Sequence, residues 1–335
     1  MQTLSTKLDH KRAASLMPLW ADPAPTPLLE RTYAPWTVLI KDETARMGLG
    51  AFKALGGIYA VANLCLGSDA SGDVSLETIC AAATGKTFVC ASAGNHGMAV
   101  ARGAKIFGAA ARIHLSDTVP ESFMARLEAE GATVIRSGAT YEESIEAAIE
   151  DANSHGFIHL ADGSWPGYTE PPRLVMEGYT VLAEEMRAVF EVSGDWPTHV
   201  FLQAGVGGMA AAVAQMIRKN WAVQPEIIVV EPEAAPCLDE AVKAGRVVNV
   251  IGPVSNMGRL DCKTASMLAF EILQETADTY IQTSDEEAQT AADVLAKLDV
   301  PKTTPSGAAG FAALRQMAPP VSARPLIVVS EGAVT

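Results

Sequence analysis

Cysteine is scarce in this sequence, which holds five among 335 residues. The number is odd and no two cysteines form a CxxC pair, so neither a disulfide framework nor a structural zinc site is expected. Most of them lie in apolar or helical-looking stretches, as buried free thiols of a reducing compartment do. Near the N-terminus the apolar stretch is short and is broken by Pro18 and Asp22, which speaks against a secretory signal. The sequence therefore predicts a cytoplasmic protein without a metal site.

Positive charge is also scarce. Lys and Arg total 25 against 39 Asp and Glu, which gives a formal net charge of −14. No cluster of basic residues offsets this balance, so binding to nucleic acid or to an anionic membrane is not expected. Long apolar runs are lacking too, because the most apolar segment, residues 200–217, contains Gln203, Gln215 and several glycines. That segment predicts a buried strand running into a helix and not a membrane span.

Apolar residues, in contrast, make up 49% of the chain, enough for a sizeable globular core. Short β-rich runs alternate with helical patterns in two series. The first series has predicted strands at 87–91, 111–115, 133–135 and 157–160, and helices at 96–107, 121–130 and 141–152. The second has strands at 199–203, 226–231 and 326–329, helices at 209–219 and 237–244, and the further run 247–251. This alternation predicts parallel βαβ units in a doubly wound α/β fold, with two domains and a cleft between them.

A glycine-rich loop follows the predicted strand at 199–203. Gly205, Gly207 and Ala210 fit the dinucleotide pattern G-x-G-x-x-A, and Glu231 ends the next strand, where a ribose-binding acid belongs. The same loop also suits a single phosphate of a small cofactor, held by backbone N–H groups at a helix N-terminus. A tight turn that binds nothing is the third interpretation. The loop alone leaves all three open.

Two other segments bear on that choice. Lys53 follows apolar residues and precedes Gly56 and Gly57. An apolar setting lowers the pKa of a lysine and makes it a nucleophilic amine or a Schiff-base former, although a single lysine is more often a solvated helix residue. Asn95, in the run Ala-Ser-Ala-Gly-Asn-His-Gly at a strand-to-helix junction, supplies an amide where a cofactor ring oxygen could bind. His96 beside it would by itself be a capping or core histidine.

The order of the motifs GxxxFKxxGG, SAGNHG, QxGxGGxxA and a late Ser-Glu-Gly resembles the fold type II pyridoxal-phosphate enzymes, the serine/threonine dehydratase and tryptophan synthase β superfamily. The resemblance extends from about residue 26 to residue 332. Within it, DGSWPGY at 162–168 and MEGY at 176–179 are similar to the DxxWxGY…MxGY stretch of diaminopropionate ammonia-lyases. The segment around Glu231 also matches that subfamily, so Glu231 needs no ribose, and an NAD(P)-dependent dehydrogenase becomes the weakest alternative.

The resemblance implies cofactor-binding roles for particular residues. Lys53 would form a Schiff base with pyridoxal 5'-phosphate and later exchange protons at the substrate Cα. Asn95 would hydrogen-bond the cofactor's phenolic oxygen, and Ser330 would face the pyridine nitrogen. A serine hydroxyl does not hold a proton on that nitrogen as a carboxylate does, which favours expulsion of a β-substituent over transamination. The phosphate would be held by backbone N–H groups of Gly205, Val206, Gly207, Gly208 and Met209.

For the substrate, the resemblance implies contacts with Ser92, Ala93 and Tyr168. Asp162 would bind the distal ammonium of 2,3-diaminopropionate or move protons there, and it would count as catalytic beside Lys53. A turn or N-cap carboxylate before Gly163 is an equally good interpretation of Asp162.

The sequence departs from the subfamily at three places. Ala93 stands where these lyases carry an aspartate that serves as the base for the D-substrate. Many serine and threonine dehydratases also have alanine at this position. Pro305 stands where an acidic residue usually precedes Ser-Gly-Ala. The usual Ala-Gly-Leu-Ala-Cys is replaced by a more charged stretch that contains Arg259, Asp261 and, after Cys262, Lys263. Those charges belong either to the substrate site or to a domain interface.

Together the resemblance and the residues predict a fold type II enzyme with a large cofactor domain at 1–79 and 160–335 and a small mobile domain at 80–159. The expected activity is an ammonia-lyase that converts 2,3-diaminopropionate, or a related β-substituted amino acid, to a 2-oxo acid and ammonia. A serine/threonine dehydratase of the same fold is the alternative, followed by a β-replacement synthase. The family usually forms homodimers, and a homodimer is expected here.

Overall fold

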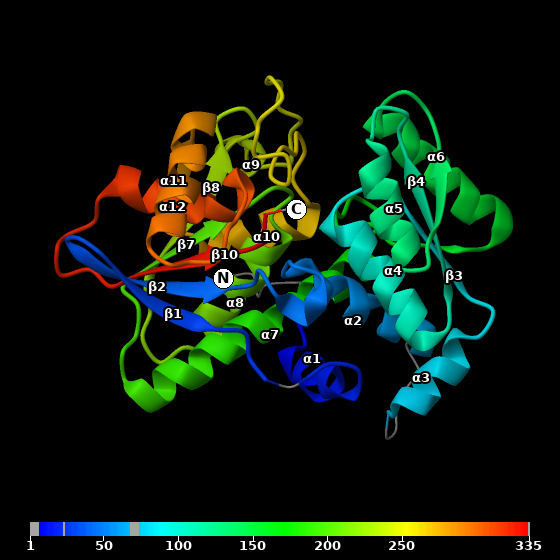
Figure 1. Ribbon diagram of the computed structural model, residues 1–335, viewed down its shortest axis with the longest axis horizontal. Coiled ribbons are helices and arrows are strands. Elements are labelled where there is room, and N and C mark those ends of the chain that lie inside the picture. The colour runs from blue at the N-terminus through cyan, green and yellow to red at the C-terminus, as the bar shows by residue number, and fades with distance from the viewer. Residues whose placement is uncertain (1–6, 23, 68–73, 334–335) are drawn as a thin grey trace.

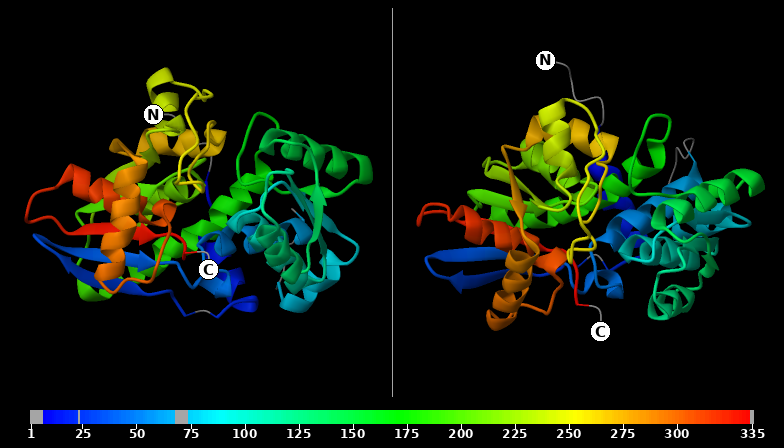
Figure 2. Two further views of the ribbon diagram at one scale, coloured as in Figure 1. Left: turned by 45° about the horizontal axis from the view of Figure 1, so that its top comes forward. Right: turned by 90° about the horizontal axis from the view of Figure 1, so that it is seen from above.

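The computed structural model describes residues 7–22, 24–67 and 74–333 of the chain. These residues form one sheet of six strands and one of four, each covered by helices. In Figure 1 the two sheets lie side by side in separate lobes, with β7, β8 and β10 in one and β3 and β4 in the other. Both views in Figure 2 keep these lobes distinct. The α/β architecture predicted from the sequence is confirmed.

The larger sheet has the strand order β1-β2-β10-β7-β8-β9. Its strands are β1 (Leu28–Tyr33), β2 (Trp36–Asp42), β7 (His199–Gln203), β8 (Glu226–Pro232), β9 (Thr279–Thr283) and β10 (Pro325–Val329). All neighbours are parallel except β1, which pairs antiparallel with β2 at one edge. Every residue of β10 is buried, as expected for an apolar strand in a parallel sheet covered on both faces.

Alternate residues of these strands face two different helical layers, because side chains along a strand point to opposite sides. Val200 and Leu202 belong to the same core as α7 (Glu170–Ser193), α8 (Gly208–Asn220) and α10 (Met267–Thr276). Phe201 between them belongs to the core formed with α11 (Asp285–Lys297) and α12 (Pro305–Met317). Four short elements complete this lobe: α1 (His10–Leu16), the 3-10 turns η1 (Met17–Leu19) and η2 (Arg46–Gly48), and α9 (Cys237–Ala244).

The smaller sheet is parallel throughout, with the order β5-β4-β3-β6. Its strands are β3 (Thr87–Cys90), β4 (Ala110–Leu115), β5 (Thr133–Arg136) and β6 (Ile158–His159), and its helices are α3 (Leu76–Ala83), α4 (Asn95–Phe107), α5 (Glu121–Ala129) and α6 (Tyr141–His155). Ala148 and Ala152 of α6 pack on Val89 of β3. Short side chains at this spacing let the helix lie close to the sheet.

Helix α2 (Lys53–Leu66) links the two lobes, because it packs on α4 of one and on α7 of the other. Two consecutive glycines permit both contacts. A Cβ atom on Gly57 would lie 2.5 Å from Ala99 Cβ, and one on Gly56 would lie 2.4 Å from Tyr179 Cε1. The pair of glycines that follows the predicted cofactor lysine therefore sets the position of the helix that carries it.

The strands and helices predicted in the two series agree with the structure. The further run 247–251 forms neither a strand nor a helix and contains only an isolated bridge between Asn249 and Thr264. Ile251 is 98% exposed, whereas Val247 and Val250 pack partly buried against the core. Helix α3 runs across the predicted domain boundary at 79/80, and the domain limits stay a prediction.

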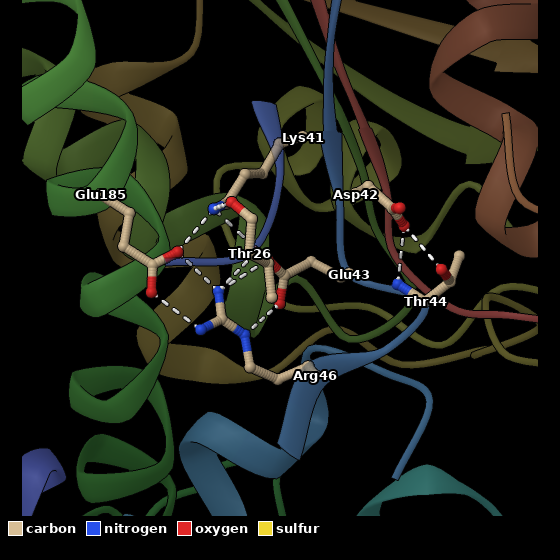
Figure 3. A network of polar contacts seen from close by, with 7 residues as sticks. All are labelled: Thr26, Lys41, Asp42, Glu43, Thr44, Arg46 and Glu185. Carbon is tan, nitrogen blue, oxygen red and sulfur yellow. Dashed lines mark hydrogen bonds and ion pairs between the residues drawn. The ribbon is translucent and has the colours of Figure 1, made fainter. Parts of the chain in front are cut away.

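A buried network of charges supports the loop that leads from β2 into α2 (Figure 3). Arg46 donates to Glu43 Oε2 at 2.7 Å from Nε and to Glu185 Oε2 at 2.6 Å from Nη2. Lys41 Nζ donates to the same Glu185 oxygen at 2.5 Å and to the Thr26 carbonyl at 2.7 Å. We call the four charged residues Lys41, Glu43, Arg46 and Glu185 the interior cluster. Their side chains are between 0% and 13% exposed, and each ion has an opposite charge in contact.

Candidate active site

A cavity of about 320 Å³ lies between the two lobes and is lined by residues that follow β3, β7 and β10, together with the start of α2. Of the residues to which the resemblance assigned a cofactor or substrate role, all but Tyr168 lie in its wall. Those in its wall are Lys53, Ser92, Ala93, Asn95, Asp162, Gly205, Val206, Gly207, Gly208, Met209 and Ser330. Segments far apart in the chain therefore meet where a cleft in an α/β fold binds its ligand.

Lys53 is the first residue of α2, and its amine contacts Asp162 Oδ2 as a hydrogen-bonded ion pair. Burial alone would lower the pKa of Lys53, but the Asp162 carboxylate outweighs that effect and raises it. The expectation of a lowered pKa for Lys53 was thus wrong, because the apolar setting is present but the carboxylate of Asp162, distant in sequence, contacts the amine. The same pair holds the pKa of Asp162 well below its usual range, although burial would raise it.

Ser92 and Ala93 lie in the turn between β3 and α4, and Asn95 begins the helix. The turn is tight: a Cβ atom on Gly97 would lie 2.0 Å from the Ser92 carbonyl oxygen. Asn95 Nδ2 donates to Glu331 Oε2, which brings the small lobe into contact with the segment after β10. The first backbone N–H groups of α4 have no acceptor within the helix and face the cavity end of the turn.

The glycine loop connects β7 with α8 and is shaped by close contacts. Gly207 has φ +98°, and a Cβ atom there would lie 2.9 Å from Leu238 Cδ1. On Gly205 it would lie 3.0 Å from both the Arg259 carbonyl oxygen and Cys262 Sγ. Since α8 begins at Gly208, the N–H groups of its first turn lack acceptors within the helix. This is an anion cradle of the size of one phosphate group.

Ser330 follows β10 and lines the same cavity. Its Oγ accepts a hydrogen bond of 3.0 Å from Gln203 Nε2. Because the hydroxyl oxygen is accepting there, its own proton is available for an acceptor in the cavity.

Glu231 is not among the residues that line the cavity. Its carboxylate accepts from the N–H groups of Leu238, at 2.8 Å, and Asp239, at 2.9 Å, and so caps the start of α9. The ribose-binding role considered for the dehydrogenase alternative is not supported, because both carboxylate oxygens are used within the fold.

Tyr168 lies beside the cavity but not among its lining residues. Its hydroxyl donates to the His159 carbonyl at 2.9 Å and accepts from the Ala161 N–H at 3.0 Å. Its ring stacks on Trp165 with a centroid separation of 4.3 Å. Tyr168 therefore fixes the segment that carries Asp162.

Three further charged residues line the cavity: Arg259, Asp261 and Glu331. Glu331 was given no role from the sequence, and its place next to Ser330 in the late Ser-Glu-Gly motif was the available signal. For Arg259 and Asp261 the sequence left open a substrate site or a domain interface, and the structure places both in the cavity wall. We call Lys53, Asp162, Arg259 and Glu331 the cavity cluster. Near Arg259 in the chain, Asp261 Oδ1 accepts a hydrogen bond of 2.5 Å from Lys263 Nζ. Lys263 Nζ also donates to two backbone carbonyls.

The donor set suits pyridoxal phosphate group by group. Lys53 offers an amine for a carbonyl carbon, the α8 cradle offers N–H groups for a phosphate, and Ser330 offers a hydroxyl proton for a ring nitrogen. Within the described part of the chain, no group of three or more His, Cys, Asp or Glu side chains could hold a metal ion. None of the helices there is long and apolar enough to cross a bilayer.

Comparison with known proteins agrees with this site. Residues 19–332 match the family model described as "Pyridoxal-phosphate dependent enzyme", and the chain belongs to that family. Its cofactor is pyridoxal phosphate, and its two sheets have the fold type II architecture.

Individual relatives define the chemistry more closely. Diaminopropionate ammonia-lyase of Escherichia coli (strain K12) is 34% identical over 284 residues, which cover 81% of this chain and 71% of that protein. The crystal structure of the holo form of the Escherichia coli enzyme has a TM-score of 0.88 at 29% identity and covers 99% of this chain and 90% of that chain. L-serine dehydratase/L-threonine deaminase of Homo sapiens is 32% identical over 206 residues, 61% of this chain and 60% of that protein. The chain is thus a pyridoxal-phosphate-dependent β-elimination enzyme related to diaminopropionate ammonia-lyase.

Proposed function

We propose that the chain is an ammonia-lyase that acts on L-2,3-diaminopropionate or a related β-substituted amino acid. The reaction removes a proton from Cα and the substituent from Cβ, and hydrolysis then leaves a 2-oxo acid and ammonia. From 2,3-diaminopropionate and one water the products are pyruvate and two molecules of ammonia. The observation that carries this proposal is the contact between Lys53 and Asp162 at the wall of the cavity.

Lys53 is the proposed attachment point of the cofactor and the group that moves the Cα proton. When bound, pyridoxal phosphate supplies an electron sink that stabilises negative charge at the substrate Cα. The amine of Lys53 lies at the start of α2, so helix packing fixes where the proton is taken up. The amine has to be neutral to take up the Cα proton, and once it is protonated the contact with Asp162 stabilises it, so that a proton is then at hand in the cavity for the departing group.

Asp162 is the proposed binding site for the distal ammonium of the substrate. In the structure this carboxylate holds the ammonium of Lys53, and a substrate ammonium on Cβ is the same chemical group. Its low pKa keeps Asp162 ionised over the whole neutral range, as an ammonium-binding residue requires.

The substrate's α-carboxylate is proposed to bind at the turn of Ser92 and Ala93. The first N–H groups of α4 are oriented as donors at that end of the cavity, where a negative charge is also favoured by the helix dipole. Asn95, held by Glu331, is proposed to contact the cofactor, and Ser330 to donate to its ring nitrogen. A neutral donor at that nitrogen favours elimination over transamination.

Dehydration of serine or threonine is the second candidate, and Ala93 is the observation that favours it. The wall at this point carries a methyl group and no carboxylate. A hydroxyl substituent on Cβ needs no second anion beside it, whereas an ammonium gains from one.

The stoichiometry of the products tests both candidates in one assay. Holoenzyme is incubated with L-2,3-diaminopropionate, L-serine or L-threonine, and 2-oxo acid and ammonia are measured together. The proposal predicts two ammonia per pyruvate from L-2,3-diaminopropionate, with kcat/KM at least about 10-fold above that for L-serine, a difference worth about 1.4 kcal/mol. A higher kcat/KM for L-serine or L-threonine, with one ammonia per 2-oxo acid, would favour the dehydratase. No 2-oxo acid from any of the three would contradict both.

The expected homodimer and cytoplasmic location belong to this proposal as well. Light scattering of the purified chain tests the first, with twice the mass of the 35.2 kDa chain as the expected result.

A further inference from the structure

Arg259 places a guanidinium in the cavity wall that no side chain of the site fully neutralises. Its Nε lies 3.6 Å from Glu331 Oε2, and its guanidinium carbon lies 5.6 Å from the ring centroid of Phe123 in the small lobe. The side chain is 29% exposed. Within the described residues, the only hydrogen bond of Arg259 that involves a side chain runs from its backbone N–H to Ser306. The guanidinium therefore has donors to offer to a ligand.

Other arginines of the molecule show what a satisfied guanidinium looks like. Arg102 donates to both oxygens of Glu130, at 2.5 and 2.7 Å, and Arg112 donates to both oxygens of Asp151, at 2.7 and 3.2 Å. This two-bonded arrangement matches the fork of a guanidinium to a carboxylate. Arg259 lacks it, although a carboxylate is close.

Glu331 does not serve as that partner, because its oxygens are already used. Oε1 accepts from the Thr304 hydroxyl at 2.5 Å, and Oε2 accepts from Asn95 Nδ2. At 3.6 Å the contact with Arg259 Nε is longer than a hydrogen bond. Glu331 is therefore fixed at one side of the guanidinium and leaves the Nη1 and Nη2 groups free of it.

The free end of Arg259 faces the turn that is proposed to bind the α-carboxylate. A Cβ atom on Gly94 would lie 2.8 Å from Nη1, nearer than the 3.8 Å to Nε. The same cavity wall carries Asp162, where the substituent on Cβ is proposed to bind. The stretch Ala-Gly-Leu-Ala-Cys, which is usual in diaminopropionate ammonia-lyases, has glycine where this chain has Arg259.

We propose that Arg259 binds a second carboxylate carried on Cβ of the substrate, so that the enzyme also acts on dicarboxylic 3-hydroxy amino acids such as 3-hydroxyaspartate. The inference rests on the proposed lyase chemistry and adds a substrate class to it. Arg259 is a specificity-determining residue in this account, with Phe123 and Glu331 holding it in place.

The reaction balances without any oxidant or further reactant. The Cα–H bond breaks and its proton passes to Lys53, while the Cβ–O bond breaks and the hydroxyl leaves as water with one proton. The resulting enamine rearranges to an imine, and one water hydrolyses the C=N bond to release ammonia. The product is a four-carbon 2-oxo dicarboxylate, and the water consumed equals the water released.

The test compares wild type with R259G and R259K. R259G removes the side chain, and R259K keeps the positive charge but cannot donate two parallel hydrogen bonds to one carboxylate. In the wild type we expect 2-oxo acid from L-3-hydroxyaspartate. R259G should lose ~30-fold or more in kcat/KM for that substrate and less than about threefold for L-serine, and R259K should fall between. Cofactor content and Tm show that each variant is folded.

A binding measurement without turnover accompanies it. Malonate, an inert dicarboxylate, is titrated into holoenzyme by calorimetry, with acetate as the one-carboxylate control. We expect malonate to bind at least about 10-fold more tightly than acetate in the wild type and R259G to abolish that difference.

Two results would overturn the proposal. An equal loss for L-serine and L-3-hydroxyaspartate in R259G would make Arg259 a ligand of the α-carboxylate. Unchanged malonate binding in R259G would show that the guanidinium does not bind a second anion. Failure of the proposed function looks different: L-serine or L-threonine would then be the better substrate, or no 2-oxo acid would form from any amino acid, while the malonate result still tests Arg259 on its own.

Discussion

The interior cluster and the cavity cluster each hold two cations and two carboxylates, yet they differ in how these charges are paired. In the interior cluster Arg46 donates to both Glu43 and Glu185, and every charge has a bonded partner. In the cavity cluster Lys53 and Asp162 form a pair, whereas the guanidinium of Arg259 makes no hydrogen bond within the described residues and lies 3.6 Å from Glu331. Charges that are paired within the protein support the fold. A cavity cation without a hydrogen-bonded partner is a candidate site for an anionic ligand.

The two lysines show the same contrast. Burial is the largest effect on Lys41, and its pKa is lowered although Glu185 and Glu43 are near. Burial acts on Lys53 as well, but the direct contact with Asp162 prevails and the pKa is raised. Both amines contact a carboxylate directly, but Glu185 is shared with Arg46, whose positive charge further lowers the pKa of Lys41.

Replacing the cavity lysine should have the largest effect on function. K53A should lower kcat by at least about 10⁴-fold, because both the covalent attachment and the Cα proton transfer depend on that amine. The assay is 2-oxo acid formation by protein with added pyridoxal phosphate. K105A is the matched control, since Lys105 is an exposed residue of α4 bonded to a backbone carbonyl. Equal activity of K53A and wild type would remove Lys53 from the site.

Breaking the interior cluster should affect stability instead. E185A leaves Lys41 and Arg46 without their shared carboxylate, and we expect a loss of about 3–5 kcal/mol in the free energy of unfolding. Denaturant unfolding measures it. On the same helix, E191Q removes an exposed carboxylate from Arg187 and should cost no more than about 1 kcal/mol. Similar losses of unfolding free energy in the two variants would show that the buried ion pairs contribute no more to stability than the exposed one.

Neutralising Asp162 tests whether that carboxylate controls the lysine. D162N should lower kcat/KM for L-2,3-diaminopropionate by about 10²–10³-fold and that for L-serine by less, since only the former carries a Cβ ammonium. Asp162 raises the pKa of Lys53, so its loss lowers that pKa and increases the neutral amine at a given pH. Capture of pyridoxal phosphate by apoenzyme, followed by absorbance, should therefore reach its plateau at lower pH in D162N. An unshifted pH profile would contradict this account.

Glu231 differs from the carboxylates of both clusters, because it is buried and accepts hydrogen bonds from two backbone N–H groups instead of contacting a cation. Burial raises its pKa to about 7, above the ordinary value of 4.5. The folded chain then keeps the proton where the unfolded chain has lost it, so stability falls as pH rises from about 4.5 to 7. E231Q cannot lose a proton and should flatten this fall, by about 3 kcal/mol at most. An identical pH dependence of Tm in both proteins would contradict the assignment.

The smallest effect is expected from the phosphate cradle. G207A forces alanine into φ +98° and towards Leu238, at a cost of about 1–2 kcal/mol. We expect about 10-fold weaker binding of pyridoxal phosphate. G245A also has a positive φ, +65°, but its Cβ would meet nothing within 4 Å. That control should bind the cofactor as wild type does, and equal weakening in both would remove the loop's special role.

The comparison also indicates what sequence alone could predict. Strand and helix alternation and the ordered motifs located Lys53, Asn95, the glycine loop and Ser330 in the cavity wall, because most of these motifs follow a strand and parallel strands end at one edge. The direction of the Lys53 pKa shift could not be predicted, since Asp162 is 109 positions away in the chain. Nor could the free state of Arg259, which depends on Thr304 and Asn95 already occupying Glu331. The structure of the run at 247–251 could not be predicted either, because its apolar pattern does not reveal that Val247 and Val250 pack against the core while Ile251 is exposed.

Mapping the covalent link between cofactor and protein tests the central claim most directly. Holoenzyme is reduced with borohydride, digested and analysed by mass spectrometry, with K53A treated alongside. The account predicts that the reduced pyridoxyl group is found on Lys53 and that K53A carries none at that position. A pyridoxyl group on another lysine, or on none in a protein that forms 2-oxo acid, would contradict it.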